Sequence, residues 1–174
     1  MPRSSGADDA SVTQILDALR RMTRHLRVAD RQAERRLGIS GAQLFTLQQL
    51  ARSPAQSIND LADLTHTHQS SVSVVVRRLV DHGLVTRRQG ADDARRVELR
   101  ISGAGQTLLR RSPVTPQARL IAALERMPSA ARTKLSELLD HVVNEMGAAA
   151  EPAAMFFEET PAPPTPRRRR QARR

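Results

Sequence analysis

The spacing of apolar residues constrains the fold of this chain most, because over most of residues 11–149 it follows the helical period of 3.6. The first such stripe predicts a helix over 11–37, opened by a capping box of Ser11 and Gln14 and ending near Gly38. Its apolar residues are Val12, Ile15, Leu16, Leu19, Met22, Leu26, Ala29, Ala33 and Leu37. The chain is therefore expected to be mainly α-helical.

Three shorter helices are predicted next. Ser40 with Gln43 and Ser57 with Asp60 form two further capping boxes, and each should open a short amphipathic helix. A third short helix follows after a break of only a few residues and ends at Gly83. Two short helices joined by a tight turn are thus expected in the middle of the chain.

The apolar period changes from 3.6 to two after Gly83. Residues 84–88 lead from Leu84, Val85 and Thr86 into two arginines, a polar tip, QGADDA, follows, and residues 97–101 alternate in polarity, which predicts a β-hairpin with a flexible basic tip. Helical stripes resume at 120–127 and 135–146. The order helix, helix, turn, helix and basic hairpin over residues 40–102 is that of a winged helix-turn-helix, in which the second helix of the pair enters the DNA major groove.

Composition narrows the possible functions. Lys and Arg number 28 against 18 Asp and Glu, a net charge of +10, so an anionic partner is expected, either duplex DNA or an acidic surface. With no Trp or Tyr the chain lacks rings on which to stack single-stranded bases, and with no Cys it has no thiol chemistry. No segment has the apolar length of a membrane helix or a signal peptide, which favours a cytoplasmic protein.

Several motifs in the middle of the chain carry a family resemblance. The stretch LADLTHTHQSSVSVVVRRLVDHGLVTRR, followed by DDARRVELRISGAG, resembles the multiple antibiotic resistance regulator (MarR) family of bacterial transcription factors. The likeness covers about residues 11–149 in architecture and is strongest over 57–105. It implies a winged helix-turn-helix at 40–102 and helical dimerisation regions at 11–37 and 103–149. A flexible N-terminus (1–10) and a disordered tail rich in Pro and Arg (150–174) are expected outside them.

The resemblance also implies which residues face DNA. On the recognition helix they are Gln69, Ser70, Ser71, Ser73 and Arg77, and on the wing Arg87, Arg88, Asp93, Arg95 and Arg96. Arg95 matches the arginine that enters the minor groove, and Asp93 matches the acid that orients it. Three alternatives without DNA contact remain open: Ser70 and Ser71 only cap the helix, Arg77 is a solvated surface residue, and Arg95 belongs to an exposed charged tip. Thr67 is a second candidate for the helix cap beside His68, which would shift the helix start by one residue.

The family further implies a homodimer that binds a pseudo-palindromic operator in double-stranded DNA and is released by a small hydrophobic or aromatic effector. A nonspecific or architectural DNA-binding protein is the alternative. His66 and His68, with Asp60 and Asp63 nearby, form a weak candidate metal site, and the other histidines have no assigned role. Because the common catalytic motifs are missing from the sequence, we expect no enzyme and no cofactor.

Overall fold

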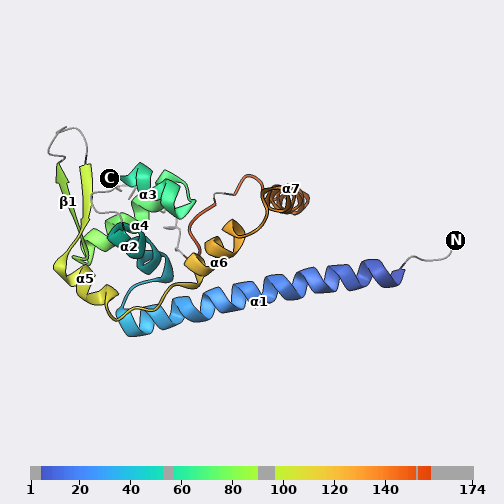
Figure 1. Ribbon diagram of the computed structural model, residues 1–174, viewed down its shortest axis with the longest axis horizontal. Helices are drawn as coiled ribbons and strands as arrows, with labels where there is room; N and C mark the ends of the chain where they lie inside the picture. Colours follow the sequence, from blue (N-terminus) through green and yellow to red (C-terminus); the bar gives the residue numbers. More distant parts are fainter. Residues whose placement is uncertain (1–4, 53–56, 90–96, 152, 158–174) are drawn as a thin grey trace, which may run out of the picture.

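The computed structural model describes residues 5–52, 57–89, 97–151 and 153–157. Figure 1 shows a body of short helices and a two-stranded hairpin, from which the long helix α1 (Ser5–Leu37) projects. Only the C-terminal half of α1 packs on the body, where Leu26 and Ala33 are buried. The helix begins at Ser5, so the expected start at Ser11 is wrong and residues 5–10 are helical rather than flexible.

The two capping boxes that open the central helices are confirmed. At the start of α2 (Gly41–Arg52), the amide of Gln43 donates to Ser40 Oγ at 3.2 Å and the amide of Ser40 donates to Gln43 Oε1 at 3.0 Å. Ser57 and Asp60 make the same reciprocal pair at α3 (Ile58–Thr65). Each box satisfies amides that the first helical turn leaves unpaired, so these helices start where their sequences predict.

Helix α4 (Gln69–Asp81) leads into the hairpin. Its strands β1 (Val85–Gln89) and β2 (Val97–Ile101) pair antiparallel, with Val85 opposite Ile101. Ser102 holds the base of the hairpin, because its hydroxyl donates to the carbonyl oxygen of Gly83 at 2.7 Å. The hairpin is thereby fixed to the end of α4, as the change of period predicts.

The chain then forms α5 (Gly103–Leu109), α6 (Pro116–Glu125) and α7 (Ser129–Glu145). Residues 110–115 separate α5 from α6, and Pro116, which suits a first helical position, begins the second helix. Helix α7 has no buried residue in the described chain. The body therefore has a buried core, whereas α7 contributes no buried residue to it.

The core lies between α2, α3, α4 and the hairpin. Its fully buried side chains include Phe45, Leu47, Leu50, Leu61, Val72, Val75, Val76, Leu79 and Leu99. Met155, ten residues past the end of α7, joins this core with only 3 % of its surface exposed. The expectation that the chain is disordered from residue 150 is therefore wrong at Met155, because this side chain is seated in the body. Residues 158–174 lie outside the described part.

Candidate nucleic-acid interface and adjoining cavity

The turn before α4 sets the register of the candidate recognition helix. His66 ends α3 in a left-handed conformation with φ 51°, and its amide donates to the carbonyls of Ala62 and Asp63. The hydroxyl of Thr67 donates backwards to the carbonyl oxygen of Thr65 at 3.0 Å, and Thr67 lies one residue before the N-cap position of α4. His68 is the N-cap residue by its backbone, with no side-chain capping bond, and Gln69 is the first helical residue.

One face of α4 packs in the core and the opposite face is open. Ser70, Ser73 and Arg77 lie three and four residues apart, so at 100° per residue they share the face away from buried Val75 and Leu79. Ser70 and Arg77 are exposed and Ser73 is half-buried. Gln69, exposed, and Ser71, half-buried, flank that face. The outward face thus has hydroxyls near the helix start and a guanidinium two turns later.

One residue of this face was missed by sequence reasoning. Val74 is only half-buried and follows Ser70 by one turn, whereas its neighbours Val72, Val75 and Val76 are buried. Its position relative to Ser70 and Arg77 was the available signal, but a valine in an apolar run reads as core. An outward valine between polar neighbours suits contact with a thymine methyl group.

The hairpin carries the next positive charges. Arg87 and Arg88 are exposed on β1, where they stand opposite Leu99 and Glu98. The three other wing residues named above, Asp93, Arg95 and Arg96, lie outside the described residues. Among the described residues of α4 and the hairpin, the exposed arginines are therefore Arg77 on α4, Arg87 and Arg88 on β1, and Arg100 on β2, which pairs with Glu98 at 3.3 Å.

The candidate metal site has no support among the residues that the structure describes. No group of three or more His, Asp and Glu side chains there is arranged to hold a metal ion. His66 and His68 are both exposed beside the helix start.

No helix of the described ranges is long and apolar enough to cross a membrane.

A cavity of about 230 Å³ lies beside the base of the projecting helix α1. Helix α1, helix α2, the 110–115 loop, α6 and the segment 156–157 form its walls. Its apolar lining includes Leu26, Ala33, Leu44, Val114 and Phe157, and its ionisable lining is His25, Asp30, Arg36, Arg111 and Arg119. Sequence reasoning named no cavity residue and gave His25 no role. Three arginines against one carboxylate favour an uncharged or anionic occupant with an apolar body.

Helix α2 receives a contact from each of three cavity walls. Asp30 of α1 accepts a hydrogen bond from the Gly41 amide at 2.6 Å. Gln48 Nε2 donates to the carbonyl oxygen of Pro113 at 2.8 Å, in the 110–115 loop. From the C-terminal segment, Met155 Sδ lies 3.8 Å from the hydroxyl oxygen of Thr46. A change in any of these walls therefore reaches the helix on which α3 and α4 pack.

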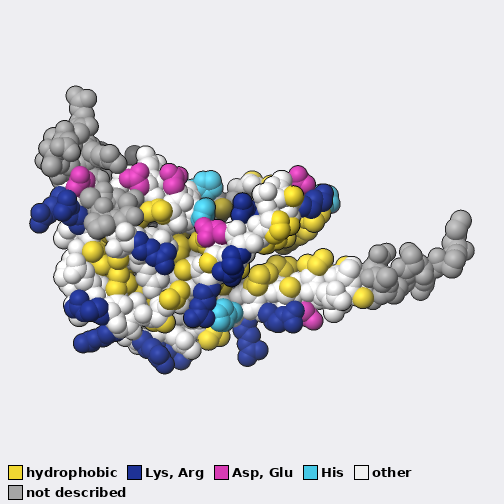
Figure 2. All heavy atoms as spheres, viewed as in Figure 1, with side chains coloured by type: hydrophobic (Ala, Val, Ile, Leu, Met, Phe, Trp, Pro, Cys, Tyr) yellow, Lys and Arg dark blue, Asp and Glu magenta, His cyan; other side chains and the backbone are white. Residues whose placement is uncertain are grey.

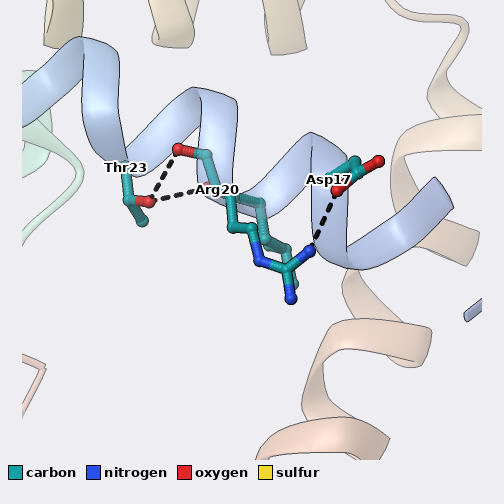
Figure 3. A network of polar contacts seen from close by, with 4 residues as sticks. Asp17, Arg20 and Thr23 are labelled. Carbon is teal, nitrogen blue, oxygen red and sulfur yellow. Dashed lines mark hydrogen bonds and ion pairs between the residues drawn. The ribbon is translucent and has the colours of Figure 1, made fainter. Parts of the chain in front are cut away.

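Apolar side chains are exposed on the two helices that extend from the body. Figure 2 shows them gathered along α1 and α7. On α1 they are Val12, Ile15, Leu16, Leu19, Met22 and Val28, and on α7 they are Leu138, Leu139, Val142 and Val143, followed by Met146 just past the helix end. Polar contacts on α1 are local to the helix: Arg20 pairs with Asp17 at 2.9 Å, and the Thr23 hydroxyl donates to the carbonyl oxygens of Leu19 and Arg20 (Figure 3). Two such apolar faces exceed what isolated surface residues produce.

Comparisons with known proteins agree with this geometry. A model of the MarR family matches residues 37–96. A solved probable transcriptional regulator from Pseudomonas aeruginosa is 26% identical, covering 74% of this chain and 96% of its own, with a TM-score of 0.50. The transcriptional regulator BldR from Sulfolobus solfataricus is 19% identical, covering 78% and 96%, with a TM-score of 0.51.

A third similar structure is a MepR-like protein complexed with pseudoligands, which is 20% identical. It covers 82% of this chain and 96% of its own, with a TM-score of 0.50. The search of curated proteins found no match.

Proposed function

Because this chain belongs to the MarR family of winged helix-turn-helix regulators, we propose that it is a dimeric, sequence-specific repressor that a small molecule releases from DNA. The observation that carries the proposal is the outward face of α4, where Ser70, Ser73 and Arg77 stand opposite the buried valines. Family membership gives DNA binding and transcriptional regulation. Repression, dimerisation and the effector belong to the proposal.

In this proposal α4 enters the major groove and the hairpin approaches the neighbouring minor groove. The serine hydroxyls and the first amides of α4 suit phosphate oxygens, whereas Gln69 and Arg77 suit base edges. Arg87 and Arg88 add phosphate contacts from β1. Asp93, Arg95 and Arg96 keep their proposed wing roles, with Arg95 in the minor groove, where a narrow groove concentrates negative potential.

The proposed dimer uses the apolar faces of α1 and α7. In one chain these faces are open to water, and a second copy of the chain would cover both through a two-fold axis. The two α4 helices would then stand about one DNA turn apart, which requires half-sites about 10 bp apart. The partner is thus a pseudo-palindromic operator in double-stranded DNA, bound in the cytoplasm without a cofactor.

The cavity is the proposed effector site. It lies between the projecting helix α1 and the DNA-facing body, and its apolar and arginine-rich lining suits a small aromatic molecule with a negative charge. The MepR-like protein, solved with pseudoligands, is a structural neighbour in which small molecules are bound. An occupant that alters the contacts at Gly41 or Gln48 would act on α2, which supports α4.

Footprinting on genomic DNA fragments tests the proposal. We expect protection of discrete imperfect palindromes, and insertion of five base pairs at the centre of one should abolish specific binding, because it places the half-sites on opposite faces of the duplex. Insertion of ten base pairs is the matched control, because it returns both half-sites to the same face of the duplex while doubling the distance between their centres. Uniform protection that ignores both insertions would instead establish the alternative, an architectural DNA-coating protein.

A thermal-shift screen with small aromatic acids, phenols and divalent metals tests the effector. A ligand that prefers the folded protein raises the melting temperature, and one that also lowers operator affinity is an effector. Metals are expected to have no effect.

A further inference from the structure

The segment just after α7 makes contacts that its position in the sequence would not suggest. Figure 1 shows the chain turning back from the end of α7 towards the body. There Met155 is 3 % exposed within the core cluster and its sulfur lies 3.8 Å from the Thr46 hydroxyl, across 109 residues of sequence. A thioether fills irregular apolar space well, so this side chain acts as an anchor.

The two residues after the anchor are directed to the cavity. Phe156 and Phe157 both line it, and their ring centroids lie 6.2 Å apart, within the range of favourable aromatic pairs. Phe157 has φ 61°, a left-handed conformation that costs energy for any residue with a β-carbon. Phe157 keeps this conformation only if its surroundings over-determine it, which indicates that contacts hold the segment in place.

We propose that residues 153–157 form a strap that completes the effector cavity: Met155 anchors it in the core, and Phe156 and Phe157 are ligand-contacting residues. The inference rests on the proposed function for the identity of the cavity, but the seating of the strap stands independently of it. The cavity keeps its open volume with the strap seated, so the rings act as a wall for the occupant. An occupant that packs on the rings holds the strap down, and a seated strap raises the affinity for the occupant.

The strap also gives the occupant a direct connection to the DNA-binding region. Thr46, beside the anchor, is fully buried on α2, and α2 packs on both α3 and α4. Motion of the strap therefore changes the packing of the helix that supports the recognition helix. This route is separate from those through Gly41 and Gln48, because it begins at the far end of the chain.

A single introduced tryptophan tests the seating directly, because the chain has no Trp and no Tyr. In Phe157→Trp we expect blue-shifted emission and weak quenching by acrylamide compared with the same chain unfolded in urea. Adding Met155→Gln, which places an amide where the thioether is buried, should shift the emission to the red and restore quenching. Adding Met155→Leu, the matched apolar control, should leave both unchanged. Far-UV circular dichroism verifies that each variant is folded.

Titration of these variants with benzoate tests the role of the strap in binding. Followed by tryptophan emission, benzoate affinity should fall about 2- to 10-fold when Met155→Gln unseats the strap, which is the range expected when an aromatic ring no longer packs on the ligand. It should not change with Met155→Leu. Equal benzoate affinity in the Met155→Gln and Met155→Leu forms would show that the aromatic rings of the strap do not contact the ligand.

The remaining outcomes separate the strap from the function on which it rests. If the tryptophan of folded Phe157→Trp has the same emission and the same acrylamide quenching as in the unfolded chain, the strap is not seated. This result overturns the proposal without any variant at Met155. If the tryptophan is shielded but benzoate binds to no variant, the strap is seated and an aromatic acid is excluded as the effector of the proposed function.

Discussion

Asp30 of α1 accepts a hydrogen bond from the backbone amide of Gly41, the first residue of α2, at 2.6 Å. The carboxylate thus meets the positive end of the α2 dipole and satisfies an amide that has no partner within the helix. The approach is close, since a β-carbon at Gly41 would lie 3.0 Å from Asp30 Oδ1. Because Asp30 also lines the cavity, one side chain both holds the start of α2 and forms part of the proposed effector site.

Replacing this carboxylate should destabilise the fold. Asp30→Ala removes a hydrogen bond to a charged group and leaves the Gly41 amide unsatisfied, so we expect a loss of about 1.5–3 kcal/mol in the free energy of unfolding. Asp17→Ala is the matched control on the same helix, because its ion pair with Arg20 is exposed and should contribute under about 1 kcal/mol. Urea denaturation measures both, and equal losses would deny Asp30 its role.

A pair of neighbouring glycines provides a second test of packing. In Gly105→Ala the new β-carbon would meet the Leu84 carbonyl oxygen and lie 2.7 Å from Ile101 Cγ1, so the base of the wing must shift. We expect a loss of about 1–3 kcal/mol. Gly103→Ala, in the same helix, meets nothing within 4 Å and should be neutral or slightly stabilising. Thermal melts of the two variants should therefore move apart, and a common shift would contradict the close packing.

The proposed dimer face should be sensitive to charge. Leu139→Asp places a carboxylate on the apolar face of α7, where the side chain is 47% exposed in one chain, and we expect dissociation at low micromolar concentration. Leu64→Asp is the matched control, since Leu64 is 40% exposed on α3, away from both apolar faces. Analytical ultracentrifugation should give the mass of one chain for the first variant and of two for the second. A dimeric Leu139→Asp protein would exclude this face.

Arg77 and Val74 should contribute to operator recognition in different ways. Arg77→Ala removes a donor to base edges and should cost about 1–3 kcal/mol on the operator but little on scrambled duplex. Val74→Ala should reduce discrimination for thymine at a single position. Arg132→Ala is the control, because that arginine lies at the start of α7. Equal losses on operator and scrambled duplex would make Arg77 a phosphate contact.

The wing and the tail should differ in salt dependence. Arg95→Ala should weaken operator binding selectively, because an arginine in the minor groove responds to groove width, which depends on the sequence. Deleting residues 161–174 should weaken all duplexes alike and flatten the plot of log affinity against log salt by about 0.9 for each phosphate that the tail no longer neutralises. Salt titrations on operator and scrambled DNA check both, and the reverse pattern would exchange the two roles.

Local signals predicted the central part of this fold well. The Ser40 and Ser57 capping boxes mark where α2 and α3 begin, because each box is formed by two residues only three positions apart in the sequence. The change of apolar period after Gly83 marks the hairpin, because the period of a strand is also set by residues close together in the sequence. At Ser11 the local signal failed, because a capping pattern inside a longer helix is outcompeted by the helical bonds that continue through it.

Contacts between distant parts of the chain were not predictable in this way. Met155 reads as part of a Pro-rich tail, and nothing in its neighbours indicates that it packs beside Thr46, 109 residues earlier. The cavity is formed where three helices, the 110–115 loop and the segment 156–157 meet, so no stripe or motif marks residues such as His25 or Arg119. The outward face of α4 was largely predicted, but Val74 was hidden because a valine run does not reveal which member turns outward.

Helix α7 is 17 residues long and buries no side chain in its own chain. Tertiary packing supplies most of the stability of helices in proteins, so in the proposed dimer the second copy would help to keep α7 formed. In a cell, a newly made chain that has not met a partner would present α7 as an easily opened substrate for proteases. Chains in excess of their partners would then be removed faster than assembled ones, and intracellular turnover would help to set the level of regulator available to DNA.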